Sequence, residues 1–379
     1  MNFSEIPSPC YVVDEKQLRK NLELIKGLKQ RAGVSVIVAF KGYALWKSFY
    51  LVREYLDGAT ASSLNEARLC FEEMESLAHT YSVAYTEDDF QNILKYSQHI
   101  SFNSLAQFRK FFPSAKRFKK HAVSCGVRIN PDFSVVETEL YNPGKPGSRL
   151  GIDYLDINES LPPGVEGFHI HCLCESSAQD TSDLLDTIES KLGKFLPKLK
   201  WLNIGGGHLM TRAGYDLVLL ENALLNFKQK YPNLEIILEP GSAIGWDTGV
   251  LRAKILDIVE NRGVRTIITD VSFTAHMPDT LEMPYRPRIR GASEPREGLF
   301  NYQIGGTSCL SGDYMTEYGF ETLPKIGDDI IFEDMIHYTM VKTSTFNGVP
   351  HPSIGMWTEE NKFLLFKKFG YLDYKNRLS

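Results

Sequence analysis

Short, apolar, β-branched runs alternate with amphipathic helical segments along this chain as far as Gly241. The strand-like runs are VSVIVAF (34–40), YSVAYT (81–86), HISFN, CGVRINP, VEGFHIH, LKWLNIGGG and LEIILEPG. This order is typical of βαβ units with parallel strands. The number of repeats predicts a closed (β/α)₈ barrel of the TIM type, and an open doubly wound sheet is the alternative.

Helices are predicted between these strands. Apolar residues recur at helical spacing from Asp14, which suits a helix N-cap, and further helices are predicted at 44–56, 64–74, 105–112, 179–195 and 215–231. After Gly241 the segments GVLRAKILDIVEN, RTIITDVSF, FNYQIGG, DDIIFEDM and HYTMVKTST indicate strands without long helices between them. We therefore predict a barrel domain at 13–241 and an all-β, barrel-like domain at 242–379, joined by residues 1–12.

Composition argues against several kinds of protein. The formal net charge of −5 and the lack of a dense Lys/Arg run argue against nucleic-acid binding. There is no signal-like N-terminus and no apolar run of about 18 residues, so we expect a cytoplasmic protein without membrane contact. The 6 cysteines are scattered, and Cys172-Leu173-Cys174 has no second ligand pair at zinc-finger spacing. Neither a disulfide framework nor a structural metal is expected.

Lys41 directly follows the apolar run at 34–40. A lysine in this place is most often a surface residue whose stem covers apolar neighbours. In a barrel, however, the carboxyl ends of the strands carry the chemistry, and an amine desolvated there becomes a nucleophile towards carbonyl groups. The second interpretation requires partner residues at neighbouring strand ends.

Two such partners follow later strands. Gly205, Gly206 and Gly207 lie between a strand and a helix, where backbone N–H groups can approach a phosphate closely. A tight strand-to-helix turn is the alternative, but it would rarely need three glycines in a row. Glu239 follows the strand LEIIL, where a buried carboxylate needs a cation or hydrogen bonds. A protonated pyridine nitrogen would satisfy it, and so would a salt bridge at the barrel rim.

His169 and His171 form a third candidate, because strand alternation places both on one face. One imidazole could stack on an aromatic cofactor ring. Two histidines at this spacing also suit a metal, but no Asp or Glu at a matching strand end provides an obvious third ligand. A zinc-dependent barrel hydrolase therefore stays open as an alternative.

Taken together, these residues meet the needs of pyridoxal 5′-phosphate (PLP). Lys41 would accept its aldehyde, the glycines its phosphate and Glu239 its pyridine nitrogen. The joint occurrence of these features at successive strand ends is far less expected by chance than any one of them alone.

Motifs along nearly the whole chain occur in the order of a known family. They are PSPCYVVD, AFKGYA, VRINP, GSRLGI, GFHIHCLCE, NIGGG, EPG, GGTSCLSGD and HYTMVKTSTFNG. The chain thus resembles the barrel-fold PLP-dependent decarboxylases, which include ornithine and diaminopimelate decarboxylases. The resemblance implies PLP as cofactor, an alanine racemase-like fold and an amino acid decarboxylase, that is, a carboxy-lyase.

The resemblance also implies residue roles. Lys41 would bind PLP covalently, and Glu239 would pair with the pyridine nitrogen and contact substrate. His171 would stack on the ring, which leaves His169 as the more structural histidine. Gly205, Gly206 and Gly207 would bind the phosphate.

In the second domain, the resemblance gives Tyr338 a phosphate contact and Asp313 a substrate contact. Cys309 falls on the cysteine that family members lend across a homodimer interface to return a proton to the substrate carbon. The homodimer would then be required for activity.

Two departures from the family pattern bear on the substrate. Ser242 replaces a phosphate-binding arginine that frequently follows EPG, and Leu310 stands where an acidic residue commonly meets a diamino acid. The signatures TASSLNE, HCLCE and TAHMPDTLEMPYRP resemble the branch that converts carboxynorspermidine and carboxyspermidine to norspermidine and spermidine in polyamine biosynthesis. His276, Asp279 and Glu282 are then candidates to bind the distal amines.

Two alternatives remain within this resemblance. The chain could decarboxylate another basic amino acid, such as ornithine, arginine or diaminopimelate. It could also be a non-catalytic PLP-binding protein, but such proteins generally consist of the barrel alone, and the β domain carrying Cys309 and Tyr338 argues against that.

Overall fold

The computed structural model describes residues 1–136, 142–157 and 161–379. The chain divides into two compact units. The barrel unit comprises residues 21–244, and the β unit comprises residues 1–20 together with 245–379. The first helix, α1 (Glu15–Ala32), runs across the division between Lys20 and Asn21.

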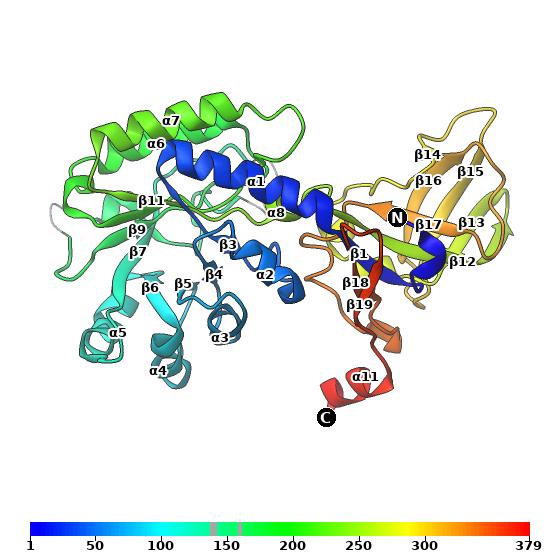
Figure 1. Ribbon diagram of the computed structural model, residues 1–379, viewed down its shortest axis with the longest axis horizontal. Helices are drawn as coiled ribbons and strands as arrows, with labels where there is room; N and C mark the ends of the chain where they lie inside the picture. The colour runs from blue at the N-terminus through cyan, green and yellow to red at the C-terminus, as the bar shows by residue number, and fades with distance from the viewer. Residues whose placement is uncertain (137–141, 158–160) are drawn as a thin grey trace. The chain divides into compact units, whose positions relative to one another are not determined.

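The barrel unit is built on a parallel sheet (Figure 1). Along the described residues its strands follow the order β2-β11-β10-β9-β7-β6-β5-β4-β3. Their bounds are β2 (Ser35–Val36), β3 (Val38–Ala39), β4 (Ala59–Ala61), β5 (Ala78–Ser82), β6 (Ser97–Phe102), β7 (Ser124–Asn130), β9 (Gly167–His169), β10 (Trp201–Asn203) and β11 (Glu235–Leu238). The short β8 (Ile152–Asp153) pairs with β7 outside this order.

The sheet closes on itself at the strand that precedes Lys41. β2 and β3 are two halves of one strand with Ile37 between them: β2 pairs with β11, and β3 pairs with β4. The N–H of Ile37 donates to the carbonyl of Leu238, and that of Val38 donates to Gly58. The (β/α)₈ barrel prediction is therefore confirmed, and the open doubly wound sheet is excluded.

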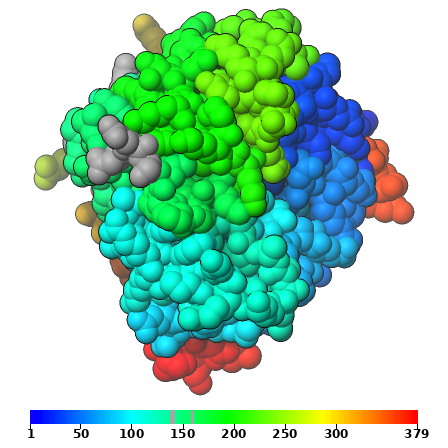
Figure 2. All heavy atoms as spheres, turned by 90° about the vertical axis from the view of Figure 1, so that its left-hand side faces the viewer, coloured from blue at the N-terminus to red at the C-terminus, as the bar shows by residue number. Residues whose placement is uncertain are grey.

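Helices cover the outside of the barrel strands. They are α3 (Leu64–Glu73), α4 (Glu87–Tyr96), α5 (Leu105–Arg117), α6 (Ala178–Leu192) and α7 (Leu217–Lys230). Each begins after a Ser, Thr or Asp whose side chain accepts a backbone N–H of the first turn. Segments coloured cyan to green cover most of the face that Figure 2 shows.

Two predicted elements of the barrel unit were wrong. The strand predicted at 81–86 lies instead at Ala78–Ser82, because the apolar pattern continues into the loop that leads to α4. The helix predicted at 44–56 is reduced to a 3₁₀ turn, Trp46–Ser48, and the short α2, Phe49–Val52. Its buried residues make several separate contacts, among them the stacking of Phe49 on Phe40 with 4.9 Å between ring centres.

The β unit contains one mixed sheet in the described residues, with the order β14-β16-β15-β13-β12-β1-β18-β19 and β17 paired to β12. Its strands are β1 (Cys10–Asp14), β12 (Gly249–Asn261), β13 (Val264–Thr269), β14 (Ala292–Ser293), β15 (Phe300–Gly305), β16 (Tyr314–Phe320), β17 (Asp329–Glu333), β18 (Ser353–Trp357) and β19 (Phe363–Lys367). The N-terminal β1 lies between β12 and β18. An all-β second unit is thus confirmed.

One strand predicted in the β unit is absent from the described structure. Residues 337–345 form turns, and Tyr338 has a φ of 47°, which a strand does not allow. Short helices occur as well: α9 (Phe273–His276), α10 (Asp279–Glu282) and α11 (Tyr371–Leu378). Among the described residues, no helix combines the length and apolar composition that crossing a membrane requires.

Trp201 fills the middle of the barrel. Its ring occupies space left by glycines on two neighbouring strands, since a Cβ at Gly126 or Gly167 would lie 2.4 Å or 2.0 Å from the ring. Ile37 and Ile237 pack on Trp201, and its indole N–H donates to the Ser124 hydroxyl at 2.9 Å. The barrel is therefore a packed core below the carboxyl ends of its strands.

This packing predicts that Gly167→Ala lowers the free energy of unfolding by about 1–3 kcal/mol, because an added methyl group overpacks a rigid core. Equilibrium denaturation in urea measures the change. Gly27→Ala is the matched control: in helix α1 the added Cβ meets only the flexible end of Arg31, and alanine favours the helix. Equal stability of wild type and Gly167→Ala would contradict the packing argument.

Candidate active site

Four predicted site features meet at the carboxyl ends of the barrel strands. Lys41 follows β3, His171 follows β9, the glycines 205–207 follow β10 and Glu239 follows β11. Because these strands are parallel and neighbouring, their ends lie at one mouth of the barrel.

Lys41 and His171 form the centre of this mouth. The Nζ of Lys41 lies 3.0 Å from Nε2 of His171, and the N–H of Gly206 donates to Nδ1 of the same imidazole at 3.1 Å. A ring nitrogen that accepts a proton donor carries no proton itself, so a neutral His171 holds its proton on Nε2. Lys41 then accepts that proton's hydrogen bond, which requires a neutral amine.

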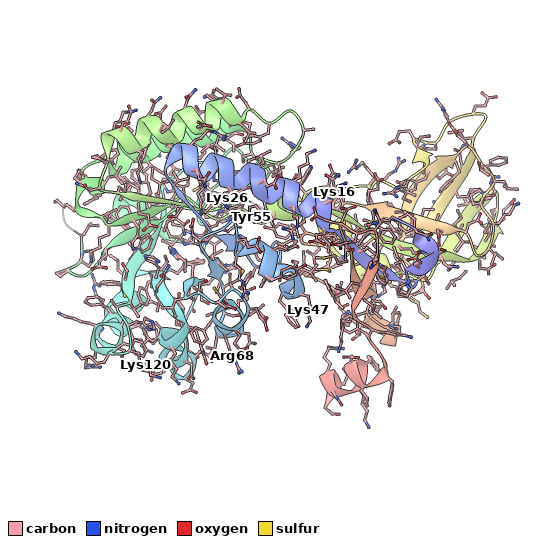
Figure 3. The ribbon with its side chains drawn as sticks, in the orientation of Figure 1. Lys16, Lys26, Lys47, Tyr55, Arg68 and Lys120 are labelled. Carbon is pink, nitrogen blue, oxygen red and sulfur yellow. The ribbon has the colours of Figure 1, made fainter. Side chains whose placement is uncertain are left out.

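The electrostatic surroundings favour this arrangement. Solvent reaches Lys41, but crowding by protein atoms lowers its pKa, and the Arg128 guanidinium lowers it further, against a smaller opposite effect of Glu239. Burial brings the pKa of His171 well below its usual range, and Lys41, whenever its amine is protonated, and Arg128 lower it further. By contrast, Lys47 and Lys120 are ordinary exposed lysines, and Lys26 lies over the ring of Tyr55 at 5.0 Å (Figure 3).

Arg128 lies on β7 and is only 4% exposed. Its guanidinium stacks on the Tyr81 ring at 4.6 Å and donates to the carbonyl oxygen of His171 at 3.2 Å. Tyr81 also contacts the edge of His169, with 5.0 Å between ring centres. Arg128 therefore fixes the backbone of the loop that carries His171.

Glu239 is held by groups on three other strands. The Asn203 amide donates to one carboxylate oxygen at 2.6 Å, and Nε2 of His169 lies 3.6 Å from the other. Burial raises the pKa of Glu239, while hydrogen bonds from Asn203 and Thr60 and the nearby Lys41 and Arg128 oppose that rise. The carboxylate is thus buried with hydrogen-bond donors but without a direct ion pair to Arg or Lys in the described residues.

The three glycines are required by their protein neighbours. A Cβ at Gly205 would lie 2.4 Å from His171, one at Gly206 would lie 2.3 Å from the Glu239 carbonyl, and one at Gly207 would lie 2.5 Å from Leu173. Gly205 and Gly207 also have φ values of 70° and 100°.

The N–H groups of this loop are not all free for a phosphate. That of Gly205 donates to the Asn203 side chain at 2.8 Å, and that of Gly206 donates to His171. Only the N–H of Gly207 has no partner among the described residues. The loop therefore positions Asn203 and His171 as well as offering a donor.

The remaining predicted residues lie in the β unit, in two linked groups. Cys309 is exposed, and its N–H donates to the Asn347 side chain at 2.9 Å. Asp313, in the same loop, accepts the N–H of Ser308 at 3.0 Å and that of Thr274 in α9 at 3.0 Å. Both carboxylate oxygens of Asp313 therefore already organise the Cys309 loop.

His276 ends α9 and Asp279 begins α10. His276 is fully buried, and burial lowers its pKa to about 4, so it is neutral at neutral pH. Asp279 accepts the hydroxyls of Tyr285 at 2.8 Å and Thr339 at 2.7 Å on one oxygen. Its other oxygen is buried without a partner in the described structure. Thr339 thereby links Asp279 to the turn that carries Tyr338.

Two other residues discussed from the sequence have local roles. Glu282, exposed at the end of α10, forms an ion pair with Lys342. Ser242, at the position of the missing arginine, begins the short helix α8 (Ser242–Gly245).

Comparison with known proteins identifies the chain's relatives. A family model described as pyridoxal-dependent decarboxylase, C-terminal sheet domain, matches residues 10–336. The chain belongs to this family of pyridoxal-dependent decarboxylases. It is 48% identical to carboxyaminopropylagmatine decarboxylase of Synechocystis sp., over 99% of this chain and 96% of that protein. It is 42% identical to carboxynorspermidine/carboxyspermidine decarboxylase of Campylobacter jejuni, over the full length of both.

A solved structure gives the same relationship. The crystal structure of carboxynorspermidine decarboxylase from Campylobacter jejuni, complexed with norspermidine, superposes with a TM-score of 0.91 at 40% identity. The match covers 98% of this chain and 100% of that chain. The decarboxylase described here is thus an enzyme of the carboxy-lyase class with pyridoxal phosphate as cofactor.

The described residues fit that cofactor. Lys41 offers an amine whose pKa is lowered, Glu239 offers a buried carboxylate, and His171 presents a neutral ring fixed by Gly206. The imidazole nitrogens of His169 are buried without hydrogen-bond partners, and a polar group bound in the mouth would supply one. Lys41 would hold the aldehyde carbon, Glu239 the pyridine nitrogen and Gly207 part of the phosphate.

Sequence reasoning missed the residues that hold these groups in place. Arg128, Tyr81, Asn203 and Thr60 all face the barrel interior. Arg128 left a signal, because a charged residue in the middle of the apolar strand CGVRINP has to be accommodated inside. Tyr81 was missed because its strand was predicted too late in the sequence. Asn203 was missed because the glycines that follow it gave the stronger signal.

The lowered pKa of Lys41 predicts its reactivity in the cofactor-free protein. A small aldehyde together with borohydride should label Lys41 at a rate that rises with pH. The inflection of this rise should lie below the ordinary lysine pKa of 10.5, because a lowered pKa leaves more neutral amine at each pH. Peptide mass spectrometry follows the labelling, and Lys41→Ala identifies the peptide. An inflection at or above 10.5 would contradict a lowered pKa of Lys41.

Proposed function

We propose that this enzyme decarboxylates carboxynorspermidine or carboxyspermidine, giving norspermidine or spermidine in cytoplasmic polyamine biosynthesis. The observation that carries the proposal is the full-length similarity, at 42% identity, to an enzyme named for these substrates, together with the Lys41, His171 and Glu239 arrangement in the barrel mouth. Two relatives named for aminopropyl-extended substrates make ornithine, arginine and diaminopimelate weaker candidates.

The chain's own groups would then divide the work. Bound PLP supplies an electron sink for the carbanion that remains when CO₂ leaves. Glu239, fixed by Asn203 and Thr60, would offer a carboxylate to the pyridine nitrogen, and this would favour a protonated nitrogen. His171, fixed at Nδ1 by Gly206 and at its carbonyl by Arg128, provides a neutral wall that does not compete for the carboxylate.

Asp279 is our candidate for binding a distal amine of the substrate. Its partner-free oxygen is buried, and a buried carboxylate oxygen is best satisfied by a cationic donor. Leu310, 44% exposed beside Cys309, replaces an acidic group at the position where a shorter diamino acid would need one. Asp313 and His276 would line this region without binding the amine. Asp313 already accepts hydrogen bonds from the Cys309 loop, and His276 is neutral.

The name of one relative indicates a second candidate substrate. The Synechocystis relative, at 48% identity, is named for carboxyaminopropylagmatine. That name implies a guanidinium in place of the terminal ammonium, and a guanidinium binds a carboxylate through two parallel hydrogen bonds. Asp279, with one oxygen already occupied, offers a single free oxygen and so favours an ammonium.

The substrate assignment is tested by CO₂ release from carboxynorspermidine, carboxyspermidine, carboxyaminopropylagmatine, ornithine, arginine and diaminopimelate. We expect the highest kcat/KM on the first two, and no turnover in Lys41→Ala. Asp279→Asn should raise KM roughly 10- to 100-fold with little change in kcat, since a charge-assisted hydrogen bond contributes about 1.5–3 kcal/mol.

Glu321→Gln, an exposed carboxylate of the β unit, is the control and should behave as wild type. A preference for carboxyaminopropylagmatine would move the assignment to the second substrate. Turnover of ornithine alone would reject both substrate assignments.

We also propose that Cys309 acts across a homodimer. Cys309 is an exposed thiol on a loop fixed by Asn347 and Asp313, as a residue presented to a second chain would be. Its thiol would return a proton to the substrate carbon after CO₂ has left.

Mixing two impaired variants tests this arrangement. Lys41→Ala and Cys309→Ala, denatured together and refolded, should recover up to about a quarter of wild-type activity, because half of randomly re-paired dimers are mixed and each has one intact site. Native mass spectrometry confirms that mixed dimers form. Mixed dimers without any recovered activity would show that Cys309 serves its own chain.

A further inference from the structure

His79 lies inside the barrel next to Asn203, the residue that holds Glu239. It is 2% exposed and belongs to β5, where its strand register places it opposite Thr60 of β4 and His99 of β6. Nδ1 of His79 lies 3.4 Å from the Asn203 amide nitrogen, and Nε2 lies 3.3 Å from the Ser101 hydroxyl. No role considered so far explains these two contacts.

The hydrogen-bond directions along this chain of groups can be assigned. The N–H of Gly205 can only donate, so the side-chain atom of Asn203 that receives it, at 2.8 Å, is the oxygen. The NH₂ group of Asn203 therefore faces Glu239 and His79 and can give one hydrogen to each. Nδ1 of His79 must then accept, and its proton is on Nε2, towards Ser101.

This assignment requires a neutral His79. Burial lowers the pKa of His79 well below its usual range, and the neighbouring His99 and His169 lower it further. A protonated His79 would carry a hydrogen on Nδ1, would repel the Asn203 NH₂ group and would turn the amide away from Glu239. The neutral tautomer and the orientation of the amide thus depend on each other.

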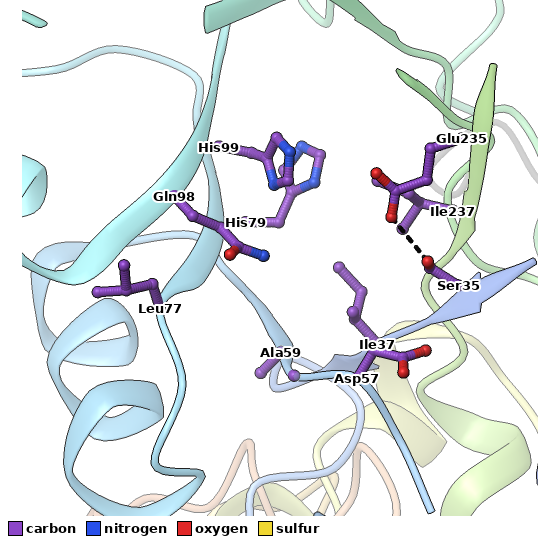
Figure 4. A pocket seen from close by; sticks show the side chains of 11 residues that line it. Ser35, Ile37, Asp57, Ala59, Leu77, His79, Gln98, His99, Glu235 and Ile237 are labelled. Atoms are coloured by element: carbon purple, nitrogen blue, oxygen red, sulfur yellow. Dashed lines mark hydrogen bonds between the residues drawn. The ribbon is translucent and has the colours of Figure 1, made fainter. Parts of the chain in front are cut away.

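The opposite side of His79 shows why an imidazole rather than an apolar residue is present. The His79 and His99 rings stack with 5.0 Å between centres and both contact Trp201. They line a small pocket of about 30 Å³ at the amino-terminal ends of the strands, with Gln98, Glu235 and Ser35 (Figure 4). This volume holds about one water molecule, too little for cofactor or substrate. Leucine or phenylalanine could make the ring contacts, but only a side chain with an acceptor at the Nδ1 position can hold Asn203.

We propose that His79 is a positioning residue for Glu239, acting through the Asn203 amide. This inference rests on the proposed role of Glu239 at the pyridine nitrogen of PLP. His79 touches neither cofactor nor substrate, so its effect is on the orientation of the carboxylate and, through it, on the protonation of that nitrogen.

The test uses the holoenzyme loaded with PLP labelled with ¹⁵N in the ring, whose chemical shift reports protonation of the pyridine nitrogen. A protonated nitrogen in wild type is the starting condition, and an unprotonated one would reject the role proposed for Glu239 rather than that of His79. In His79→Leu the ¹⁵N signal should move towards the unprotonated value. The kcat should fall roughly tenfold with KM little changed, at the low end of what losing an outer hydrogen-bond partner costs at metal sites.

Two substitutions separate positioning from general damage to the core. His79→Asn returns an acceptor near the Nδ1 position and should restore most of the ¹⁵N shift and of kcat. His99→Leu removes a stacked imidazole from the same layer but leaves both nitrogens of His79, and its ¹⁵N signal should match wild type. Wild-type behaviour of His79→Leu, or an equal change in His99→Leu, would overturn the proposal.

If His79→Leu does not fold, His79→Gln replaces it, because the glutamine amide reaches the Nε2 position and not the Nδ1 position. His79→Gln should then show the shifted signal that His79→Asn does not. Identical wild-type signals in the two variants would also overturn the proposal.

Discussion

Closure of the barrel at residues 35–39 is the constraint on which the site depends. One strand serves both edges of the sheet, because its first half pairs with β11 and its second half with β4. The N–H of Ala39 donates to the carbonyl of Pro240, directly after Glu239. Lys41 and Glu239, nearly 200 residues apart in the sequence, thereby follow neighbouring strands. An open sheet would leave the strand before Lys41 and β11 at opposite edges.

A barrel that closes around polar side chains must satisfy them internally. The interior here carries Arg128, His79, His169, Asn203 and Glu239, each of which would be costly to bury alone. For Arg128, His79, Asn203 and Glu239 the structure meets this cost with hydrogen bonds that pass between strands, and Trp201 provides the apolar packing beneath them. The glycines on β7 and β9 are part of the same solution, because they leave room for the indole.

The sequence predicted the architecture and the residues that gather at the barrel mouth, but not the residues that support them. Alternating strands and helices give a barrel because each strand needs cover on both faces, and this is a local pattern. Lys41, His171 and Glu239 were found because each stands at a strand end with an unusual side chain. Asn203 and Arg128 act through contacts to other strands, which depend on register and closure rather than on local pattern.

The β unit shows where local patterns fail. Residues 337–345 have the composition of a strand, but the turn at Tyr338 is set by contacts such as that of Thr339 with Asp279, 60 residues away. In the barrel, the apolar run at 81–86 suggested a strand three residues too late. His79 therefore lay outside every predicted strand. Without a strand, the sequence could not indicate which face of the sheet its side chain occupies.

The charges of the barrel mouth explain why its histidines can stay neutral. Burial disfavours a charged imidazole, and Arg128, together with Lys41 whenever its amine is protonated, adds repulsion, so the pKa values of His169 and His171 both lie well below the usual range. Above those pKa values the rings do not change charge with pH, and the hydrogen bonds of His171 keep one direction. Glu239 then faces a donor whose orientation is fixed, because the Asn203 amide that donates to it is itself held by the N–H of Gly205. The ring of His171 is held in the same way by the N–H of Gly206. The chain's own hydrogen bonds therefore organise the mouth, and its electrostatic field acts on a charge that develops there without first having to reorient.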